Sequence, residues 1–447
     1  MLSRLVGLAS MSVLLACSSP DAGDGPDGGL VADAGDGDAA PASGSSSYLF
    51  DDDVLRTYEL EISQTNWEWL QANATLEQYV PGMLTFEGRQ YGPVAVRYKG
   101  SFGTLNSCFD GQGNQTCSKL SMKIKFNEYD PEARFHELKK INFHSMSSDP
   151  SLVHDRLAYS LYRQMGVPAP RAVHARLIIN GELMGLFALV EQIDGRFTRM
   201  NYADGGQGNL YKEVWPLSQS AQPYLAALRT NEDENPDVTP MMRFATALAG
   251  ASDQTIEGVL EQWTDVDQLM AYLAVDRAIE NWDGIVGFWC VGTNCGNHNY
   301  YWYQDVSRDF VTLIPWDMDN TFDQPNFFET VFGEPAWDDT NASCDPVPIF
   351  DIGGTLISRR AASCDPLIRW LATVLRPRYL AASETLLDGP FRAAAVDAQL
   401  DKWEAQIASA VAEDTNGPGT ALWMSELAEM RRAVGALRAD VGALVGR

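Results

Sequence analysis

The sequence predicts an α+β protein with a β-rich part over residues 48–195 and a mainly helical part over residues 196–447. Short runs of alternating polar and apolar residues lie between residues 54 and 126, and alternation of this kind is typical of half-buried strands. Long patterns with helical spacing close the chain. The 447 residues are enough for two parts that each bury a core.

The expected strands follow from these local patterns. In Ser121–Phe126 the alternation puts Lys123 and Lys125 on one face and the apolar side chains on the other. An Asn180-Gly181 pair between two apolar runs predicts a β-hairpin. We therefore expect strands over 56–62, 91–98, 121–126, 172–179 and 185–191.

The expected helices have start and stop signals. The clearest lies over 151–165, where Ser147, Ser148 and Asp149 precede the helix and Gly166 ends it. Later in the chain, short strands at 302–303 and 310–314 are expected to flank a turn. Further helices are expected over 266–279, 391–413 and 419–445.

The chain is strongly acidic, with a formal net charge of −27. A nucleic-acid partner is not expected, because binding phosphates requires a basic surface. The acidity fits a soluble body exposed to the environment, and carboxylates also recruit divalent cations.

The first residues have the pattern of an export signal. Arg4 precedes a short apolar run that ends in Leu14-Leu15-Ala16-Cys17, which resembles a bacterial lipobox with Cys17 as the lipidated residue. Residues 18–47 are almost entirely Asp, Gly, Ala, Pro and Ser, a composition typical of a flexible tether. We expect a lipoprotein of the cell envelope, at the outer membrane or extracellular, that meets the membrane only through its lipid. The alternative is a plain secretory signal with an incidental cysteine.

Six further cysteines fall into three near pairs, as expected for disulfides in an exported protein. The alternative is a zinc site, but the spacings lack the Cys-x2-Cys form and most histidines lie far from the cysteines. The candidate pairs are Cys108 with Cys117, Cys290 with Cys295, and Cys344 with Cys364.

The densest chemical signal lies between residues 275 and 323. Asp283 stands where a helix gives way to a glycine-containing loop, Asn299 leads into a strand, and Asp317 follows the next strand. A hairpin would bring Asn299 and Asp317 to one end of the sheet. Carboxylate and amide oxygens are hard ligands that suit Mg²⁺. An Asp and an Asn that hold Mg²⁺, with a second Asp to orient a hydroxyl, are the minimal apparatus of phosphoryl transfer. The alternative is that these side chains cap turns and pair with arginines.

Several motifs in this order resemble the spore-coat-protein-H (CotH) kinase family over roughly residues 54–445. The resemblance implies a two-lobed protein-kinase-like fold, with a β-rich N-lobe, a helical C-lobe and ATP between them. The motifs are Arg97-Tyr-Lys-Gly-Ser101, Lys123-Ile-Lys-Phe126, Asn142-Phe143, His154-Asp-Arg-Leu-Ala-Tyr159, Gly166-Val-Pro168, Gly185-Leu-Phe-Ala-Leu-Val-Glu191, Asn281-Trp-Asp-Gly284, His298-Asn-Tyr300 and Pro315-Trp-Asp-Met-Asp319.

The resemblance assigns roles to the acidic residues. Asp283 matches the catalytic aspartate, which orients or accepts the proton of the substrate hydroxyl. Asn299 and Asp317 match the metal-binding asparagine and the aspartate that joins Mg²⁺ to the nucleotide phosphates, and Asp319 is expected as a second metal ligand. Mn²⁺ or Ca²⁺ is a possible substitute for Mg²⁺. The acceptor is expected to be a Ser or Thr hydroxyl of a protein.

The resemblance also implies nucleotide contacts in the N-lobe. Arg97 and Lys99, together with Lys123 or Lys125, are candidates for phosphate contacts, and a solvated strand face is the alternative for each lysine. Glu191 ends the strand that would lead to the adenine-binding hinge, with a structural role as its alternative.

One segment departs from the family pattern. Residues 286–297, with Cys290 and Cys295, are expected to form an expanded catalytic loop that alters acceptor recognition.

Two other classes of protein remain open. Asp317-Met-Asp319-Asn-Thr321 mimics the nucleophile motif of haloacid-dehalogenase-like phosphatases, which would require a Rossmann-like domain with later strands. The second alternative is a non-catalytic surface binding or structural protein on a kinase-like scaffold, with a structural metal site.

Overall fold

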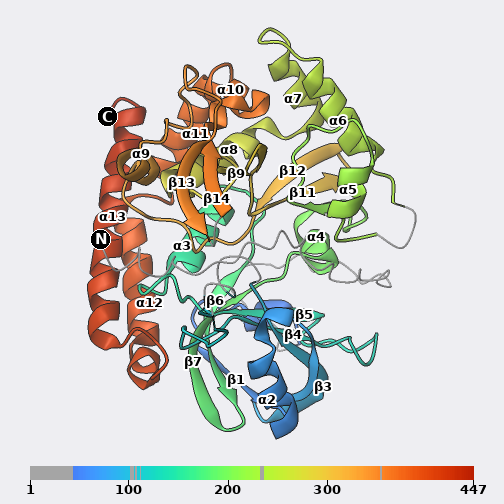
Figure 1. The fold of residues 1–447 in the computed structure, drawn as a ribbon, viewed down its shortest axis with the longest axis vertical. Helices are drawn as coiled ribbons and strands as arrows, with labels where there is room; N and C mark the ends of the chain where they lie inside the picture. The colour runs from blue at the N-terminus through green and yellow to red at the C-terminus, as the bar shows by residue number, and fades with distance from the viewer. Residues whose placement is uncertain (1–43, 101–104, 106–107, 111, 232–235, 353–354) are drawn as a thin grey trace.

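The computed structural model describes residues 44–100, 105, 108–110, 112–231, 236–352 and 355–447. The chain forms a β-rich lobe and a larger, mainly helical lobe, and each lobe has its own apolar core (Figure 1). The predicted α+β fold class is confirmed. Within the described residues, no helix combines the length and the apolar character needed to cross a bilayer. The expected lipobox at Cys17 and most of the expected tether lie outside the described residues.

The first lobe is a closed barrel of seven strands. The order around the barrel is β1-β2-β3-β4-β5-β7-β6, and β6 closes it by pairing in parallel with β1, whereas the other neighbours are antiparallel. Closure leaves the sheet without an unpaired edge. The strands are β1 (Arg56–Glu61), β2 (Val80–Phe86), β3 (Arg89–Tyr98), β4 (Met122–Lys125), β5 (Lys140–His144), β6 (Ala172–Ile179) and β7 (Glu182–Val190).

The barrel follows the patterns read from the sequence. Met122 and Ile124 of β4 point into the barrel core, as the alternation predicted. Asn180 and Gly181 join β6 to β7, and both have positive φ angles, of 53° and 83°. This backbone shape matches the twist of a two-residue hairpin, and Asn and Gly are the residues that adopt it most readily.

Helix α3 (His154–Gln164) lies between β5 and β6 in sequence but packs with the second lobe. Its apolar residues, including Leu157 and Tyr162, belong to the larger core. The helix begins three residues later than expected, because the Asp149 carboxylate accepts the backbone N–H groups of Ser151 and His154, and the chain turns there first. The remaining short helices of the first lobe are α1 (Ser46–Leu49) and α2 (Gln64–Ala72).

The second lobe contains two antiparallel sheets among its helices. One has the order β12-β11-β8, from β8 (Leu210–Lys212), β11 (Tyr300–Asp305) and β12 (Phe310–Pro315). The other has the order β10-β9-β14-β13, from β9 (Phe288–Val291), β10 (Asn294–Gly296), β13 (Val347–Ile352) and β14 (Thr355–Arg360). The helices are α4 (Gly195–Asn201), α5 (Gln222–Ala227), α6 (Thr239–Ala249), α7 (Ile256–Trp263), α8 (Val266–Ala278), α9 (Phe327–Phe332), α10 (Pro366–Ala372), α11 (Arg376–Asp388), α12 (Ala393–Glu413) and α13 (Thr420–Leu444).

One expectation about local structure is wrong. Residues 286–297 do not form an expanded loop: most of them form the β9–β10 hairpin, with Cys290 directly opposite Cys295 in the register. Helix α1 lies at the start of the described residues, where Ser46 is buried and its hydroxyl accepts hydrogen bonds from Arg171 and Arg196.

The C-terminal helices α12 and α13 run beside both lobes (Figure 1). Asp414, directly after α12, forms a buried ion pair with Lys119 of the first lobe at 2.9 Å. The same Asp414 oxygen accepts the backbone N–H of Leu186 in β7 at 2.9 Å. Near the start of the barrel, Asp52 pairs with Lys402 of α12 and with Arg156 of α3. The end of the chain therefore braces the barrel against the helical lobe.

Candidate functional site

Asp283 lies in a tight turn after α8. Asn281 is fully buried, and its side chain donates to Asp276 Oδ1 of α8 at 2.9 Å. Gly284 follows, and a Cβ at this position would collide with the side chains of Asn281 and Asp276. The motif Asn281-Trp-Asp-Gly284 is thus a turn that presents Asp283.

Both carboxylate oxygens of Asp283 accept hydrogen bonds from neutral donors. Trp289 Nε1 donates to Oδ1 at 2.7 Å, and Asn299 Nδ2 donates to Oδ2 at 2.8 Å. Asn320 Nδ2 lies 3.5 Å from Oδ2. These donors fix the carboxylate without neutralising it, as a group that orients a hydroxyl requires.

Asn299 and Asp317 meet at the end of the β11–β12 hairpin, as predicted. The Trp316 N–H donates to the Asn299 carbonyl at 3.1 Å, which ties the two segments together. Asn299 and Asp317 have positive φ angles, of 62° and 58°. Asn and Asp tolerate this region better than most residues, and such conformations are frequent at functional sites.

Helix α3 holds the backbone of residues 317–319 through three side chains. The Asp317 N–H donates to the Tyr159 hydroxyl at 3.0 Å, and the Met318 N–H donates to Asp155 Oδ1 at 3.2 Å. His154 Nδ1 lies 3.2 Å from the Asp319 carbonyl. The position of this acidic loop is therefore set by a helix that is distant in sequence.

The Asp319 side chain is incompletely satisfied. Its Oδ2 accepts a hydrogen bond from Ser148 Oγ at 3.0 Å, but its buried Oδ1 has no hydrogen-bond partner among the described residues. A buried carboxylate oxygen without a donor is costly.

The acidic residues repel one another. Burial raises the pKa of the Asp319 carboxyl well above its usual range, and the charges of Asp317, Asp155 and Asp283 raise it further. Burial also raises the pKa of Asp283, and Asp317 adds to the rise. A divalent cation would relieve both effects, and the oxygen donors of Asn299, Asp317 and Asp319 suit a hard ion. Among the described residues, however, no group of three His, Cys, Asp or Glu side chains is already arranged to hold a metal.

Lys99 reaches the acidic loop through a histidine. Its Nζ lies 2.8 Å from His144 Nε2, and His144 Nδ1 lies 2.9 Å from Asp155 Oδ2. Burial lowers the pKa of Lys99, and the Asp317 and Asp155 charges oppose that shift. Of the residues expected to contact phosphate, Lys99 is therefore the one that lies close to the acidic residues.

The other expected nucleotide contacts have different surroundings. Arg97 donates to Glu77 Oε1 at 2.8 Å, and Lys125 pairs with Glu128 at 2.8 Å. Lys123 is buried on β4, opposite Arg97 in the register. Glu191 is buried and forms a two-pronged ion pair with Arg171. Arg97, Lys125 and Glu191 therefore have partners within the protein, and their expected contacts with the nucleotide stay predictions.

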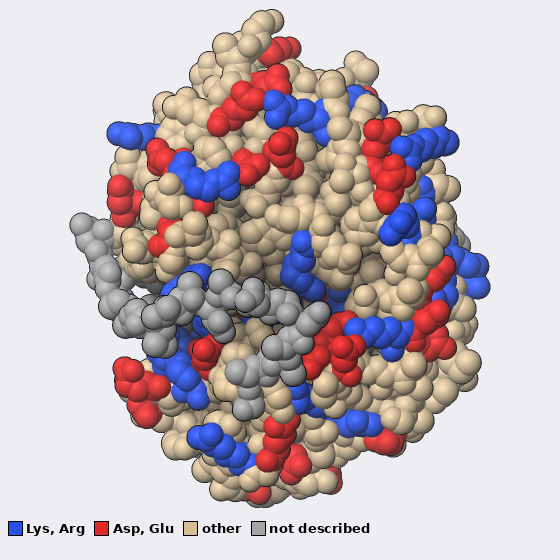
Figure 2. Space-filling view, turned by 180° about the vertical axis from the view of Figure 1, so that it is seen from behind, with Lys and Arg blue, Asp and Glu red and all other residues tan. Residues whose placement is uncertain are grey.

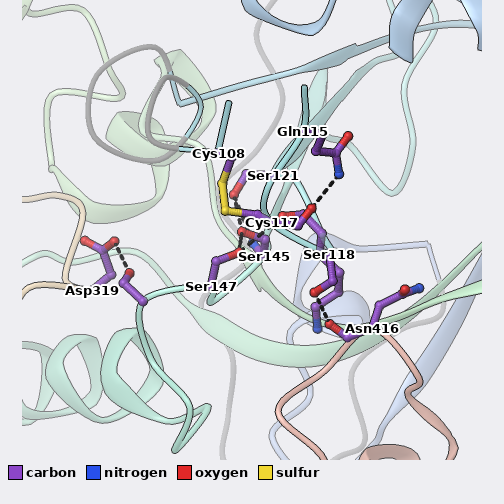
Figure 3. The surroundings of a disulfide bond; sticks show 11 residues. Cys108, Gln115, Cys117, Ser118, Ser121, Ser145, Ser147, Asp319 and Asn416 are labelled. Carbon is purple, nitrogen blue, oxygen red and sulfur yellow. Dashed lines mark hydrogen bonds between the residues drawn. A yellow bond between two sulfur atoms is a disulfide. The ribbon is translucent and has the colours of Figure 1, made fainter. Parts of the chain in front are cut away.

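The three expected disulfides are present, as Cys108–Cys117, Cys290–Cys295 and Cys344–Cys364. These six cysteines are therefore oxidised and offer no free thiolate to a zinc ion. The first disulfide lies beside a serine network, in which Ser121 and Ser147 both contact Ser145 (Figure 3).

The phosphatase alternative is wrong, because β12 pairs antiparallel with β11, whereas the motif would open a parallel sheet.

Several residues of the site were not predicted from the sequence. His144, Asp155 and Tyr159 carry the contacts from Lys99 and α3 to the acidic loop, and Trp289 positions Asp283. The motif His154-Asp-Arg-Leu-Ala-Tyr159 predicts a helix, but its spacing alone does not show which loop the helix contacts. A Lys212–Glu213 pair also adjoins the site, since the Glu213 carboxylate accepts the Asn299 N–H at 3.3 Å.

The family model described as CotH kinase protein matches residues 96–437, which is well over half of the chain. The chain therefore belongs to the CotH family. The match includes the acidic loop, the Asp283 turn, Lys99 and α3.

Curated relatives are similar at low identity. Inner spore coat protein H of Bacillus subtilis is 22% identical over 49% of this chain and 59% of the relative. Invasin CotH2 of Rhizopus delemar is 23% identical over 62% of this chain and 47% of the relative. The chain thus spans about half the length of these relatives. A solved structure titled as the Helicobacter pylori proinflammatory kinase CtkA matches 78% of this chain and 94% of its own, with 9% identity and a TM-score of 0.26.

Proposed function

We propose that this protein is an exported protein kinase that transfers the γ-phosphoryl group of Mg-ATP to a Ser or Thr hydroxyl of a surface or extracellular protein. The observation that carries the proposal is the convergence of Asp283, Asn299 and the 317–319 loop, with a buried Asp319 oxygen that no donor in the described part of the chain satisfies. Membership of a family described as kinases supports it. The three disulfides fit a protein that works in an oxidising compartment.

The residues have distinct roles in this reaction. Asp283 orients the acceptor hydroxyl and takes its proton as the oxygen attacks the γ-phosphorus and the bond to ADP breaks. Asn299, Asp317 and Asp319 would hold Mg²⁺, which neutralises charge on the phosphates when bound. Lys99, fixed by His144, contacts the phosphates and stabilises the negative charge of the transferred group.

The second candidate is a non-catalytic surface protein that uses the acidic site for a structural metal ion. Two relatives of this chain are a spore coat protein and an invasin, and this observation supports the second candidate. Each of these descriptions applies to the relative and is not transferred to this protein.

Thermal unfolding of the oxidised protein separates the two candidates. A ligand that binds only the folded state raises the melting temperature. A kinase should respond to Mg²⁺ with ATP more than to either alone, whereas a structural site should respond fully to Ca²⁺ without nucleotide. A full response to Ca²⁺ alone would count against the kinase.

A further inference from the structure

Lys212 is the basic residue at the end of β8, beside the candidate site. It lies directly opposite Tyr301 of β11 in the antiparallel register. Side chains that lie opposite one another in a sheet share a face, so Lys212 and Tyr301 project from the same side. Asn299 comes directly before β11, and Lys212 therefore lies at the end of this sheet that carries the candidate site.

Two aromatic side chains connect Lys212 with Lys99. The order of the sheet is β12-β11-β8, so Trp316, which follows β12, lies on the other side of Tyr301 from Lys212. The Tyr301 and Trp316 rings are 6.0 Å apart, centroid to centroid. Lys99 Nζ lies 5.6 Å from the centroid of the Trp316 ring. Lys99 therefore adjoins one ring of this aromatic pair and Lys212 adjoins the other, and the two lysines come from different lobes.

Both lysines interact with the charge of Asp317. Burial lowers the pKa of Lys99, and the Asp317 charge opposes that shift. Burial also lowers the pKa of Lys212, but nearby charges, first Glu213 and also Asp317, outweigh burial and raise this pKa above its usual range. The charge of Lys212 in turn lowers the pKa of Lys99, because the two cations repel each other. An anion held between two such cations is attracted by both and relieves their repulsion.

The ammonium group of Lys212 has donors to offer to a ligand. It pairs with Glu213 Oε1 at 3.6 Å, which is longer than an N–H···O hydrogen bond. About a quarter of the side chain is exposed (24%), and within the described ranges its ammonium forms no hydrogen bond to another residue. Arg359 differs, because it interacts with Asp283 but is enclosed in an ion pair with Glu334 at 3.0 Å. Lys212 therefore has a capacity for an anion that Arg359 lacks.

The candidate site has too much negative charge to accept phosphates through Lys99 alone. Asp283, Asp317 and Asp319 are negative when ionised, and a polyphosphate chain adds several more negative charges. A divalent cation and one lysine offset only part of this repulsion. The ammonium of a lysine is a compact charge that commonly binds phosphate.

We propose that Lys212 binds the phosphate chain of the nucleotide, so that the chain lies between Lys212 and Lys99. The inference rests on the proposed kinase function, and it adds a phosphate ligand from the second lobe that the sequence patterns do not indicate. The ligand class is a magnesium-bound polyphosphate, held by one lysine from each lobe.

Calorimetric titration of the oxidised protein tests this contact. The three titrants are ATP, inorganic tripolyphosphate and adenosine, each with Mg²⁺. Lys212→Gln should weaken the binding of ATP and tripolyphosphate by about tenfold, which corresponds to ~1.4 kcal/mol. The affinity for adenosine should stay the same, because adenosine has no phosphate. Lys212→Arg keeps the charge and should recover most of the affinity, and Lys212→Met gives the same comparison if Lys212→Gln fails to fold.

Arg229→Gln is the matched control. The charge of Arg229 also acts on Lys212 and Glu213, but its guanidinium donates to the carbonyls of Leu228 and Ala226. The variant removes one positive charge from the same surroundings and should leave the affinity for ATP nearly unchanged.

Undiminished ATP binding by Lys212→Gln, an equal loss in Arg229→Gln, or an equal loss for adenosine would overturn the inference and leave the kinase function standing. Tripolyphosphate binding that depends on Lys212, without any ATP binding by the wild type, would instead count against the kinase function alone. A wild type that binds none of the three titrants would contradict both.

Discussion

At the scale of single residues, Asp319 shows how the site departs from an ordinary protein surface. One of its oxygens is buried without a donor, and its carboxyl is surrounded by Asp317, Asp155 and Asp283. If Asp319 had only a structural role, we would expect a hydrogen-bond donor beside this oxygen, because an unpaired buried charge destabilises the fold. The proposed function accounts for the arrangement, because a bound cation would pair with this oxygen.

The Asp319→Asn variant tests this explanation. In EDTA we expect the variant to melt at a higher temperature than the wild type, because the substitution removes a repelled buried charge. With Mg²⁺ and ATP the wild type should gain more stability than the variant. Equal melting temperatures in EDTA, together with equal gains on adding Mg-ATP, would contradict the explanation.

His174 gives a prediction for the dependence of stability on pH. Burial lowers the pKa of His174 to about 3, and the Arg156 charge adds to the shift. Between pH ~6.5 and pH 3 the unfolded chain binds a proton at this residue that the folded chain does not, so stability falls as pH decreases. Urea unfolding at several pH values should show a shallower fall for His174→Gln. An identical slope would show that His174 does not contribute.

At the scale of elements, α3 joins the two lobes at the site. It packs in the core of the second lobe, and its Asp155 contacts both His144 of the barrel and the Met318 N–H. The helix itself was predictable from its start and stop signals. Its partner was not, because a period of 3.6 residues shows which face is apolar but does not identify the loop that the polar side chains hold.

The Tyr159→Phe variant measures the contribution of α3 to the loop. Loss of the hydroxyl that accepts the Asp317 N–H should reduce stabilisation by Mg-ATP, because one hydrogen bond of about 0.5–1.5 kcal/mol is removed. Tyr58→Phe is the control, since no described residue forms a hydrogen bond with the buried Tyr58 hydroxyl. The same Mg-ATP response in both variants would count against a role for α3.

The β9–β10 hairpin shows a limit of prediction from local sequence. Residues 286–297 have the pattern of a loop because the strands are short, and Gly and Asn occur in β10 and in the turn before it. The hairpin pairs with β14, which lies far along the chain, so the decisive contacts are not local. The cysteine pairs and the Asn180-Gly181 turn were predictable because their signals are local.

At the scale of the whole molecule, the chain combines acidic and basic side chains over much of its surface. On the face in Figure 2, Lys and Arg alternate with Asp and Glu, and no broad patch of one sign is visible among the described residues. The two lobes are held together by α3, by the C-terminal helices and by buried ion pairs. The division into a β-rich part and a helical part could be predicted from the sequence. The contacts that hold the two lobes together could not, because they join residues hundreds of positions apart.

Asp414 is the clearest test of the brace. We expect Asp414→Ala to lower the free energy of unfolding by about 3–5 kcal/mol, because Lys119 is left buried without its partner. Urea denaturation measures the change. In the double variant Lys119→Met with Asp414→Asn, much of the loss should be recovered. A loss below about 1 kcal/mol in Asp414→Ala would mean that the pair does not hold the lobes together.

The most direct test of the central claim is phosphoryl transfer from γ-labelled ATP. The oxidised protein is incubated with Mg²⁺ and a generic Ser- and Thr-containing acceptor, beside the Asp283→Asn variant. We predict that label appears on Ser or Thr and falls by about 10²–10⁴-fold in the variant, because Asp283 orients the attacking hydroxyl. The rise in melting temperature with Mg-ATP should persist in the variant. Equal labelling by both proteins, or no labelling and no Mg-ATP-dependent rise in the wild type, would contradict the account.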